Sequence, residues 1–125
     1  MDRIVVCDDE AYARRVLQMK LERAGFEVLL ACDGQEALEL VRPQAPRFHV
    51  TDLLMPRMDG LELCAALQTA GHLPALRVLV VTSSNDRAQR ARLTAFPGVV
   101  VADKPVSPSQ VCAWVRAQLQ PEVQG

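Results

Sequence analysis

Short runs of mostly apolar residues recur along the chain at intervals of about 20 to 25 residues. They are nearly continuous rather than alternating, which is typical of strands covered on both faces of a parallel sheet. We therefore predict five strands, at residues 4–7, 28–31, 48–50, 76–81 and 99–102.

The segments between these runs carry apolar residues at helical spacing, so each can place one apolar stripe on a sheet. The segment from Asn85 to Phe96 has the weakest stripe, because Arg87, Arg90 and Arg92 interrupt it, but its place between two strands favours a helix. The stripes are Ala13, Leu17, Leu21 and Ala24; Ala37 and Val41; Gly60, Leu63 and Leu67; Ala88, Ala91, Leu93 and Ala95; and Val111, Val115 and Leu119.

Turn and cap residues agree with these boundaries. Gly25 and Gly71 can end helices. Asp59 stands three residues before a glutamate, which is the pattern of a capping box. Ser107, followed by Pro108, predicts an N-cap with proline in the first helical position. Five alternating strands and helices predict a parallel α/β sandwich, in which ligands bind beyond the carboxyl ends of the strands.

Composition narrows the class of protein further. A chain of 125 residues with 50% apolar residues is the size of one compact domain, so we expect a single domain over residues 1–125 with no output domain in this chain. The 14 basic and 15 acidic residues nearly cancel, which disfavours direct nucleic-acid or membrane binding. The sequence has neither a signal-peptide pattern nor an apolar run long enough for a membrane span, and we expect a cytoplasmic protein.

The four cysteines, Cys7, Cys32, Cys64 and Cys112, lack the paired spacing of zinc or redox sites. Each has apolar or small neighbours, and we expect four buried free thiols.

Polar residues gather where the predicted strands end. Asp8, Asp9 and Glu10 follow the first strand, Asp52 the third, Thr82 and Ser83 the fourth, and Asp103, Lys104 and Pro105 the fifth. Each group alone has an ordinary structural explanation as a helix cap or a turn. Their joint position at one edge of the sheet favours a functional site.

The chemistry of this edge points to phosphoryl transfer. Asp8, Asp9 and Asp52 would repel one another unless some were protonated or a divalent cation lay among them. Carboxylate oxygens suit Mg²⁺, which also accepts phosphate oxygens as ligands. Lys104 offers a positive charge and Thr82 a hydroxyl donor to a phosphoryl group.

Four motifs carry a resemblance to a known family. The chain has DDE at residues 8–10, VTDLLMPRMDG at 50–60, VVTSS at 80–84 and DKP at 103–105. In order, spacing and strand position these resemble the receiver domains of two-component response regulators, including the chemotaxis-regulator type. The resemblance covers essentially the whole chain and implies a doubly wound, flavodoxin-like (βα)5 sandwich with strand order 2-1-3-4-5.

The resemblance also implies a role for each site residue. Asp52 would accept a phosphoryl group from a histidine kinase or a phosphotransfer histidine. Asp9 and, largely through water, Asp8 would bind Mg²⁺ together with Asp52 and the backbone carbonyl of Leu54. Lys104 and Thr82 would contact the phosphoryl oxygens, and the Lys104–Pro105 peptide would be cis. Such a domain is a signalling module that catalyses only its own phosphorylation and dephosphorylation.

The sequence departs from the family pattern at its switch and tuning positions. Val101 stands where the family usually has an aromatic, so we expect output to depend on the loop and helix from Ser83 to Phe96. Leu54 and Ser84 occupy positions that tune phosphoryl lifetime, and an apolar Leu54 cannot orient an attacking water. We therefore hypothesise a long-lived phosphoryl state. Asp103 replaces a commoner hydrophobic residue, and we expect it to be a solvated charge.

Several other residues have a structural and a functional interpretation. Trp114 is either partly exposed at an interface or packed against a neighbour. Arg87, Arg90 and Arg92 form either a solvated face or a docking patch for an acidic partner. His49 and His72 have no nucleophile placed to use them and are not expected to be catalytic bases.

Three functions remain open from the residues. The leading one is a phosphorylation-switched binding module, whose unknown downstream protein would dock on the helices from Asn85 to Phe96 and from Val111 to Leu119. The second is an aspartate-nucleophile phosphatase, although such enzymes place D-x-D after the first strand and this chain has Asp8-Asp9. The third is a receiver-like scaffold that is never phosphorylated. The end of the chain, from Pro121 to Gly125, is either a natural terminus or the edge of a longer protein.

Overall fold

A computed structural model describes residues 2–119, and the chain end from Pro121 to Gly125 lies outside the described residues. Within this range, five strands and five helices alternate along the chain, as the apolar pattern predicts. The strands are β1 (Arg3–Cys7), β2 (Glu27–Ala31), β3 (Phe48–Asp52), β4 (Arg77–Thr82) and β5 (Val99–Asp103). The helices are α1 (Ala11–Arg23), α2 (Gly34–Gln44), α3 (Gly60–Thr69), α4 (Arg87–Thr94) and α5 (Pro108–Leu119).

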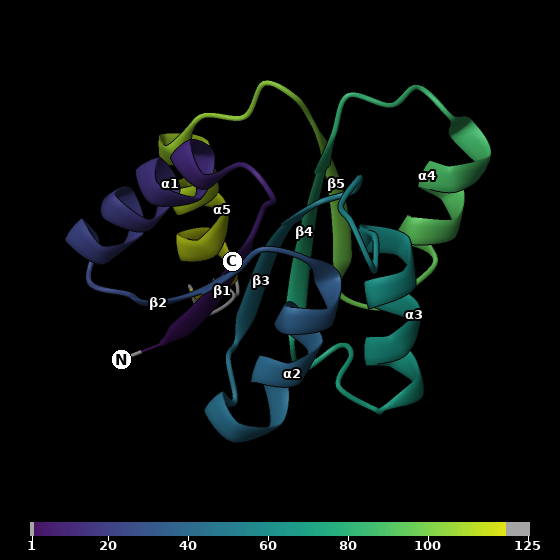
Figure 1. Ribbon diagram of the computed structural model, residues 1–125, viewed down its shortest axis with the longest axis horizontal. Coiled ribbons are helices and arrows are strands. Elements are labelled where there is room, and N and C mark those ends of the chain that lie inside the picture. Colours follow the sequence, from purple (N-terminus) through teal and green to yellow (C-terminus); the bar gives the residue numbers. More distant parts are fainter. Residues whose placement is uncertain (1, 120–125) are drawn as a thin grey trace, which may run out of the picture.

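The strands form one parallel sheet in the order β2-β1-β3-β4-β5, which confirms the predicted topology (Figure 1). β3 lies at its centre, pairing with β1 on one side and β4 on the other. All five of its residues are buried. The chain reverses its direction of travel across the sheet at β1, so the carboxyl ends of β1 and β3 adjoin at the switch point where such folds bind ligands.

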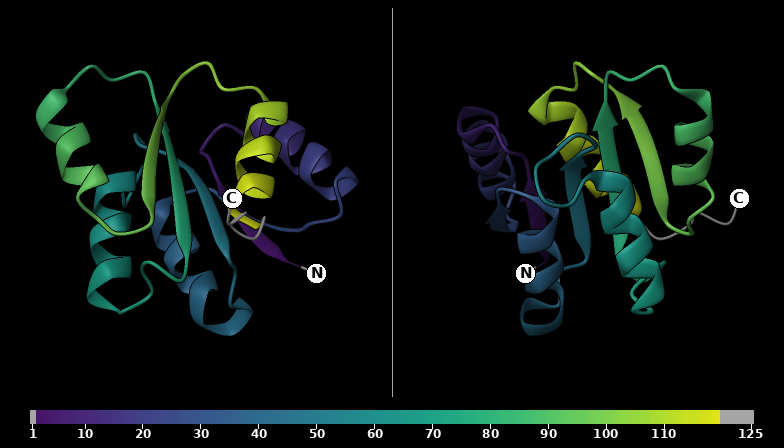
Figure 2. Two further views of the ribbon diagram at one scale, coloured as in Figure 1. Left: turned by 180° about the vertical axis from the view of Figure 1, so that it is seen from behind. Right: turned by 45° about the vertical axis from the view of Figure 1, so that its right-hand side comes forward.

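Helices cover both faces of the sheet. Figures 1 and 2 show α1 and α5 on one face and α2, α3 and α4 on the other. Each face has its own apolar core, because successive strand residues point to opposite sides. Ile4, Phe48 and Leu79 belong to the core under α1 and α5. Val5 and Val78 belong to the core under α2, α3 and α4. Apolar burial on both faces explains why the strands are nearly continuous apolar runs.

The predicted helix caps are present. Asp59 accepts a hydrogen bond from the Glu62 amide, and the Glu62 side chain accepts one from the Asp59 amide, which completes the capping box of α3. Ser107 and Gln110 make the same reciprocal pair before α5. Gly25 and Gly71, just after α1 and α3, have φ values of +98° and +81°, which only glycine adopts without strain.

The expectation that all four cysteines are buried is wrong for Cys32. Cys7, Cys64 and Cys112 are buried free thiols, whereas Cys32 is an exposed one. Cys32 lies one residue beyond the end of β2, which is an edge strand, and its amide donates to Glu36 Oε1 at 3.1 Å. The apolar and small neighbours in the sequence therefore did not indicate the exposure of this position.

Trp114 packs against a neighbouring side chain while remaining partly exposed. Its ring lies edge-on to Phe48, with 5.8 Å between the ring centroids and an interplanar angle of 75°. It contributes to the core under α1 and α5. Such an edge-to-face pair stabilises a core by more than its buried area alone.

None of the helices within residues 2–119 is both long enough and apolar enough to cross a membrane.

His49 is a polar residue at the centre of the sheet that is buried without a hydrogen-bond partner in the described part of the chain. It is fully buried in β3, and neither ring nitrogen finds a hydrogen-bond partner among the residues that the structure describes. Burial, and to a smaller extent the charge of nearby His72, lowers the pKa of His49 from 6.5 to about 3. The imidazole is therefore neutral in the folded protein near pH 7.

The buried His49 predicts a loss of stability in acid. The pKa of His49 is lower in the folded state than in the unfolded state. The unfolded chain therefore binds a proton at His49 below pH 6.5, whereas the folded chain binds one only near pH 3. In this window the stability falls by at most roughly 1.4 kcal/mol per pH unit through this group. Between pH 6.5 and 5, we expect the free energy of unfolding to fall by about 2 kcal/mol less in His49→Leu than in the wild type. The measurement is urea unfolding at each pH.

His72→Gln provides the matched control, because it removes the other histidine of the chain and leaves the buried His49 imidazole in place, so most of the acid dependence should remain. Equal pH dependence in the wild type and His49→Leu would show that His49 does not set it.

Candidate functional site

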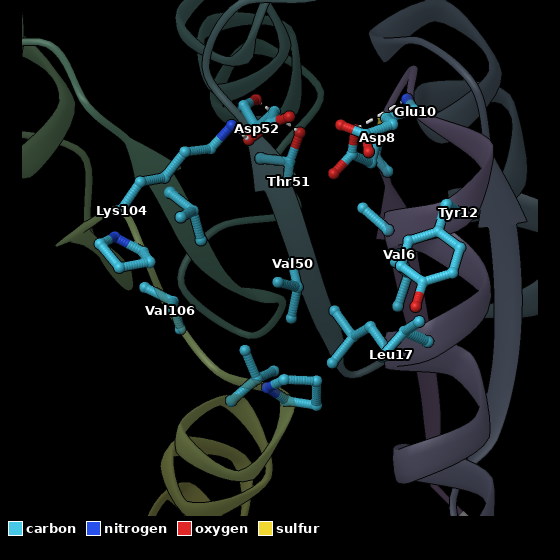
Figure 3. A pocket seen from close by; sticks show the side chains of 17 residues that line it. Val6, Asp8, Glu10, Tyr12, Leu17, Val50, Thr51, Asp52, Lys104 and Val106 are labelled. Carbon is cyan, nitrogen blue, oxygen red and sulfur yellow. Dashed lines mark hydrogen bonds and ion pairs between the residues drawn. The ribbon is translucent and has the colours of Figure 1, made fainter.

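The predicted site residues meet at the carboxyl edge of the sheet. Asp8 follows β1, Asp52 is the last residue of β3, Thr82 is the last of β4, and Lys104 follows β5. The parallel register sets them side by side: Cys7 pairs with Thr51, and Asp52 with Val81. Figure 3 shows the Lys104 side chain reaching Asp52, while the Asp8 carboxylate faces Asp52 from the β1 side.

Three carboxylates form the centre of the site. Asp8, Asp9 and Asp52 each have an oxygen within 4.8 Å of those of the other two. Asp9 is exposed, whereas Asp52 is only 9% exposed. Burial raises the pKa of Asp52 to about 6, with the charge of Asp8 adding to the rise and Lys104 opposing it. The arrangement thus holds negative charge where water cannot screen it fully.

Lys104 partly offsets this charge. Its Nζ lies 2.7 Å from Asp52 Oδ1, and the hydrogen bond to Asp52 raises the pKa of Lys104. The lysine therefore stays protonated. Its side chain is about half-exposed, so a group that enters from solvent can contact the ammonium. The Lys104–Pro105 peptide is cis, as the sequence predicts.

The donor set fits a hard divalent cation. Three converging carboxylates, one of them largely buried, supply only oxygen ligands and excess negative charge, which is what Mg²⁺ requires. Asp8 also has a structural part, since its Oδ1 accepts the Glu10 amide at 2.9 Å just before α1. This contact fixes the carboxylate toward Asp52. Asp8, Asp9 and Asp52 would hold the ion, and the carbonyl of Leu54 remains a predicted ligand.

Thr82 is connected to α4 by a chain of contacts. Its buried hydroxyl accepts a hydrogen bond from the Ser84 amide at 3.0 Å, which leaves its own proton free to be donated. The Ser84 carbonyl accepts a bond from Arg90 Nε at 2.8 Å. The same guanidinium pairs with Asp103 at the end of β5. Asp103 is a solvated charge, as expected, since its side chain is 78% exposed, and it also pairs with Arg90 from α4.

The three arginines of α4 do not act as one patch. Arg90 is held by Ser84 and Asp103, whereas Arg87 and Arg92 are exposed. Only the latter two present their charge to solvent, so the interpretation of a common basic face is wrong for Arg90.

The tuning positions differ in their surroundings. Leu54 is 72% exposed, an unusual setting for a large apolar side chain beside a polar site. Val101 is partly buried against the core under α2, α3 and α4. Ser83 is exposed and Ser84 half-buried at the start of the β4–α4 loop.

A cavity of about 370 Å³ opens next to the carboxylates. It lies between α1 and the loop before α5, with Val6 and Val50 from the sheet beneath it (Figure 3). Tyr12 and Val106 flank it on opposite sides, and Tyr12 is 77% exposed. Asp8, Asp52 and Lys104 thus line a hollow whose other walls are mostly apolar.

The sequence did not indicate one ion pair near this edge. Arg57, in the β3–α3 loop, donates to both carboxylate oxygens of Asp33, at 2.8 Å and 3.1 Å. These bonds, followed by one from the Glu36 amide, hold the pKa of Asp33 below its usual value. The D-x-x-E spacing of Asp33 and Glu36 could have predicted the cap of α2. The pairing with Arg57 has no local signal, because 24 positions separate the partners.

Comparison with known proteins agrees with this geometry. Residues 4–116 match the family model of the response regulator receiver domain. A probable transcriptional regulator ycf27 of Porphyridium aerugineum is 34% identical over 95% of this chain and 48% of its own length. The Bacillus subtilis alkaline phosphatase synthesis transcriptional regulatory protein PhoP is 32% identical over 94% of this chain and 48% of its own length. The chain thus spans about half the length of these relatives.

Solved structures agree with the fold. The Vibrio cholerae chemotaxis protein CheY4 has a TM-score of 0.84 at 24% identity, covering 95% of this chain and 99% of that one. A response regulator receiver protein from Pseudomonas putida has a TM-score of 0.83 at 26% identity, covering 93% of this chain and 96% of that one.

Proposed function

The chain belongs to the response regulator receiver domain family, whose members are signalling modules of two-component systems, and we propose that Asp52 is its phosphoacceptor. One observation carries the proposal: a largely buried carboxylate at the switch point is paired with Lys104 at 2.7 Å while two more carboxylates face it. A lone buried ion pair would not need Asp8 and Asp9 beside it. Together these groups provide a nucleophile, a countercharge and a cation site.

The reaction assigns a separate task to each side chain. A carboxylate oxygen of Asp52 attacks phosphorus in line, forming a P–O bond as the P–N bond to the donor histidine breaks. When bound, Mg²⁺ would neutralise charge on the transferring group and on the carboxylates. Lys104 stabilises the oxygens on its side, and Thr82 donates its free hydroxyl proton to another oxygen. Hydrolysis of the acyl phosphate returns Asp52 to its carboxylate.

The partners follow from this chemistry. The donor would be a sensor histidine kinase or a histidine phosphotransfer protein, which must present its phosphoimidazole at the mouth above Asp52. The downstream partner would be a protein that reads the surface of α4 and α5. A phosphatase that turns over small esters is less well supported, because Asp52 faces the countercharge of Lys104 and no acid/base carboxylate stands two residues away from it.

The test of the proposal is a phosphoryl adduct that depends on Asp52. We expect incubation with Mg²⁺ and acetyl phosphate or phosphoramidate to add the mass of one phosphoryl group to the intact protein. Asp52→Asn, which keeps the size of the side chain, should abolish the adduct because an amide is not a nucleophile here. The measurement is intact mass at early times.

Omission of Mg²⁺ should suppress the adduct as strongly as Asp52→Asn does. No adduct on the wild-type protein would support a scaffold instead, and turnover of small phosphate esters that survives Asp52→Ala would support a phosphatase.

The contacts of Thr82 provide a route for output that needs no aromatic residue at Val101. When the Thr82 hydroxyl turns toward the phosphoryl group, the Ser84 amide that is bonded to it must shift, and Arg90 connects Ser84 to α4 and β5. The signal would then pass as a change between two packings of the segment from Ser83 to Phe96.

Arg90→Gln should separate phosphorylation from this output. The variant lacks the bridge between Ser84 and Asp103, so we expect a phosphorylation rate near that of the wild type but smaller amide chemical-shift changes in α4. The measurement is an NMR amide spectrum with and without a phosphoryl donor. Arg87→Gln, on an exposed face of the same helix, should respond as the wild type does. Full α4 shifts in Arg90→Gln would reject this route.

Leu54 should lengthen the life of the phosphoryl group. Its exposed side chain lies two residues after Asp52 and has no polar atom with which to orient an attacking water. We expect Leu54→Asn to raise the dephosphorylation rate severalfold, measured as phosphate release after removal of the donor. The matched control is Leu54→Met, which keeps the side chain apolar and should leave the dephosphorylation rate close to that of the wild type. If Leu54→Asn leaves the dephosphorylation rate unchanged, Leu54 does not set the lifetime of the phosphoryl group.

A further inference from the structure

Two loops at the carboxyl edge of the sheet are fastened to each other away from the carboxylates. The β3–α3 loop, residues 53–59, carries Leu54, and the β2–α2 turn ends at Asp33, the N-cap before Gly34, which is the first residue of α2. The Arg57 guanidinium donates to both Asp33 oxygens, and the Gly34 amide donates to the Met58 carbonyl at 3.1 Å. Two adjacent residues on each side thus make a forked side-chain pair of two hydrogen bonds and one backbone bond, a set of contacts called here the loop clasp.

The turn side of the loop clasp is rigid. Asp33 is 7% exposed and also caps α2, since its Oδ1 accepts the Glu36 amide at 2.9 Å. Gly34 cannot be replaced without displacement, because a Cβ atom there would lie 2.4 Å from the Met58 carbonyl oxygen. The β2–α2 turn therefore serves as a fixed support on which the other loop rests.

The loop side needs that support. Arg57 has a φ of +66°, a left-handed conformation that a residue with a Cβ atom adopts only at a cost. A forked, charge-assisted bond to a fixed carboxylate is the kind of contact that holds such a backbone. Leu54 has no comparable anchor of its own, because its side chain is 72% exposed. Its backbone is held from the flanks, by Leu53, whose carbonyl accepts the Gly60 amide at 2.7 Å, and by the loop clasp.

We propose that Arg57, through the loop clasp to Asp33, is a positioning residue that aims the backbone carbonyl of Leu54 at the divalent-cation site of Asp8, Asp9 and Asp52. The inference rests on the proposed function, which places a Mg²⁺ ion there. It adds a requirement that the carboxylates alone do not impose: the ion needs the loop in one conformation, and a residue outside the ligand set selects it. Partners of this kind, beyond the ligands themselves, commonly determine metal affinity.

The charge of Arg57 and its positioning role predict opposite changes in Mg²⁺ affinity when Arg57 is removed. Arg57 is a cation, so its removal would by charge alone make the edge more negative and strengthen binding of Mg²⁺. If Arg57 positions the loop, its removal weakens binding instead. Arg57→Lys separates the two further, since lysine keeps the charge but cannot make the forked pair.

The experiment measures Mg²⁺ binding to the metal-free chain by calorimetry, with no phosphoryl donor present. We expect Arg57→Gln and Arg57→Lys each to weaken binding roughly tenfold. Asp33→Asn, which keeps the cap acceptor of α2 but not the charge, should weaken it similarly. The double variant Asp33→Asn with Arg57→Gln should be no weaker than either single variant, because both remove the same contact. Arg92→Gln, on the exposed face of α4, is the matched control and should bind as the wild type does.

A second readout separates positioning from general destabilisation. With acetyl phosphate, the Mg²⁺ concentration for half-maximal phosphorylation should rise in Arg57→Gln, while the rate at saturating Mg²⁺ stays near that of the wild type. Unchanged or tighter Mg²⁺ binding in Arg57→Gln would overturn the proposal. Wild-type protein that binds Mg²⁺ but gains no phosphoryl adduct would overturn the proposed function while leaving the role of Arg57 measurable.

Discussion

The crowding of three carboxylates at one edge of the sheet is the constraint on which the rest of this structure depends. Asp8, Asp9 and Asp52 approach to within 4.8 Å, and burial raises the pKa of Asp52 to about 6. A folded chain tolerates such a cluster only if a carboxylate takes up a proton or compensating charge is close. Lys104 supplies part of it at 2.7 Å, and the geometry leaves room for a divalent cation to supply more. In the proposed function this excess negative charge attracts a divalent cation, and the bound cation together with Lys104 would offset the charge of a phosphoryl group.

The fold serves this cluster by bringing distant segments to one edge. Parallel pairing of β1, β3, β4 and β5 aligns four chain segments at their carboxyl ends, and helices on both faces bury the strands that carry them. The loops at this edge are then tied down by polar contacts. Arg57 fastens the β3–α3 loop to Asp33, and Arg90 fastens the β4–α4 loop to Asp103. In the roles proposed for them, the Arg57 contact would support binding of the ion, and the Arg90 contact would transmit phosphorylation to α4.

Much of this could be predicted from the sequence, because it depends on local patterns. Buried parallel strands leave continuous apolar runs in the sequence. The spacing of Asp59 and Ser107 from their capping partners predicts the starts of two helices, and the structure has both caps. The acidic residues, Thr82 and Lys104 were identifiable because each directly follows or ends a strand. Observed element bounds differ from the predicted ones by a few residues, as in α4, which begins at Arg87 after an Asp86 cap rather than near Asn85.

What the sequence could not indicate are contacts between residues far apart along the chain. The Arg57–Asp33 pair, the Arg90–Asp103 pair and the packing of Trp114 on Phe48 all depend on tertiary placement. Cys32 is a further case in which tertiary placement decides. Its apolar and small neighbours suggest burial, but it follows the edge strand β2 and is exposed. Local patterns thus specified the candidate site residues, and tertiary contacts specify how they are held.

The most direct measurement of the central claim is the stability of the chain with and without Mg²⁺, in the wild type and in Asp8→Asn. Asparagine keeps the acceptor for the Glu10 amide but removes one of the repelling charges. The account predicts that, without divalent cations, Asp8→Asn unfolds at higher urea than the wild type, and that millimolar Mg²⁺ stabilises the wild type far more than the variant. Equal stability without metal, together with an equal response to Mg²⁺, would contradict it.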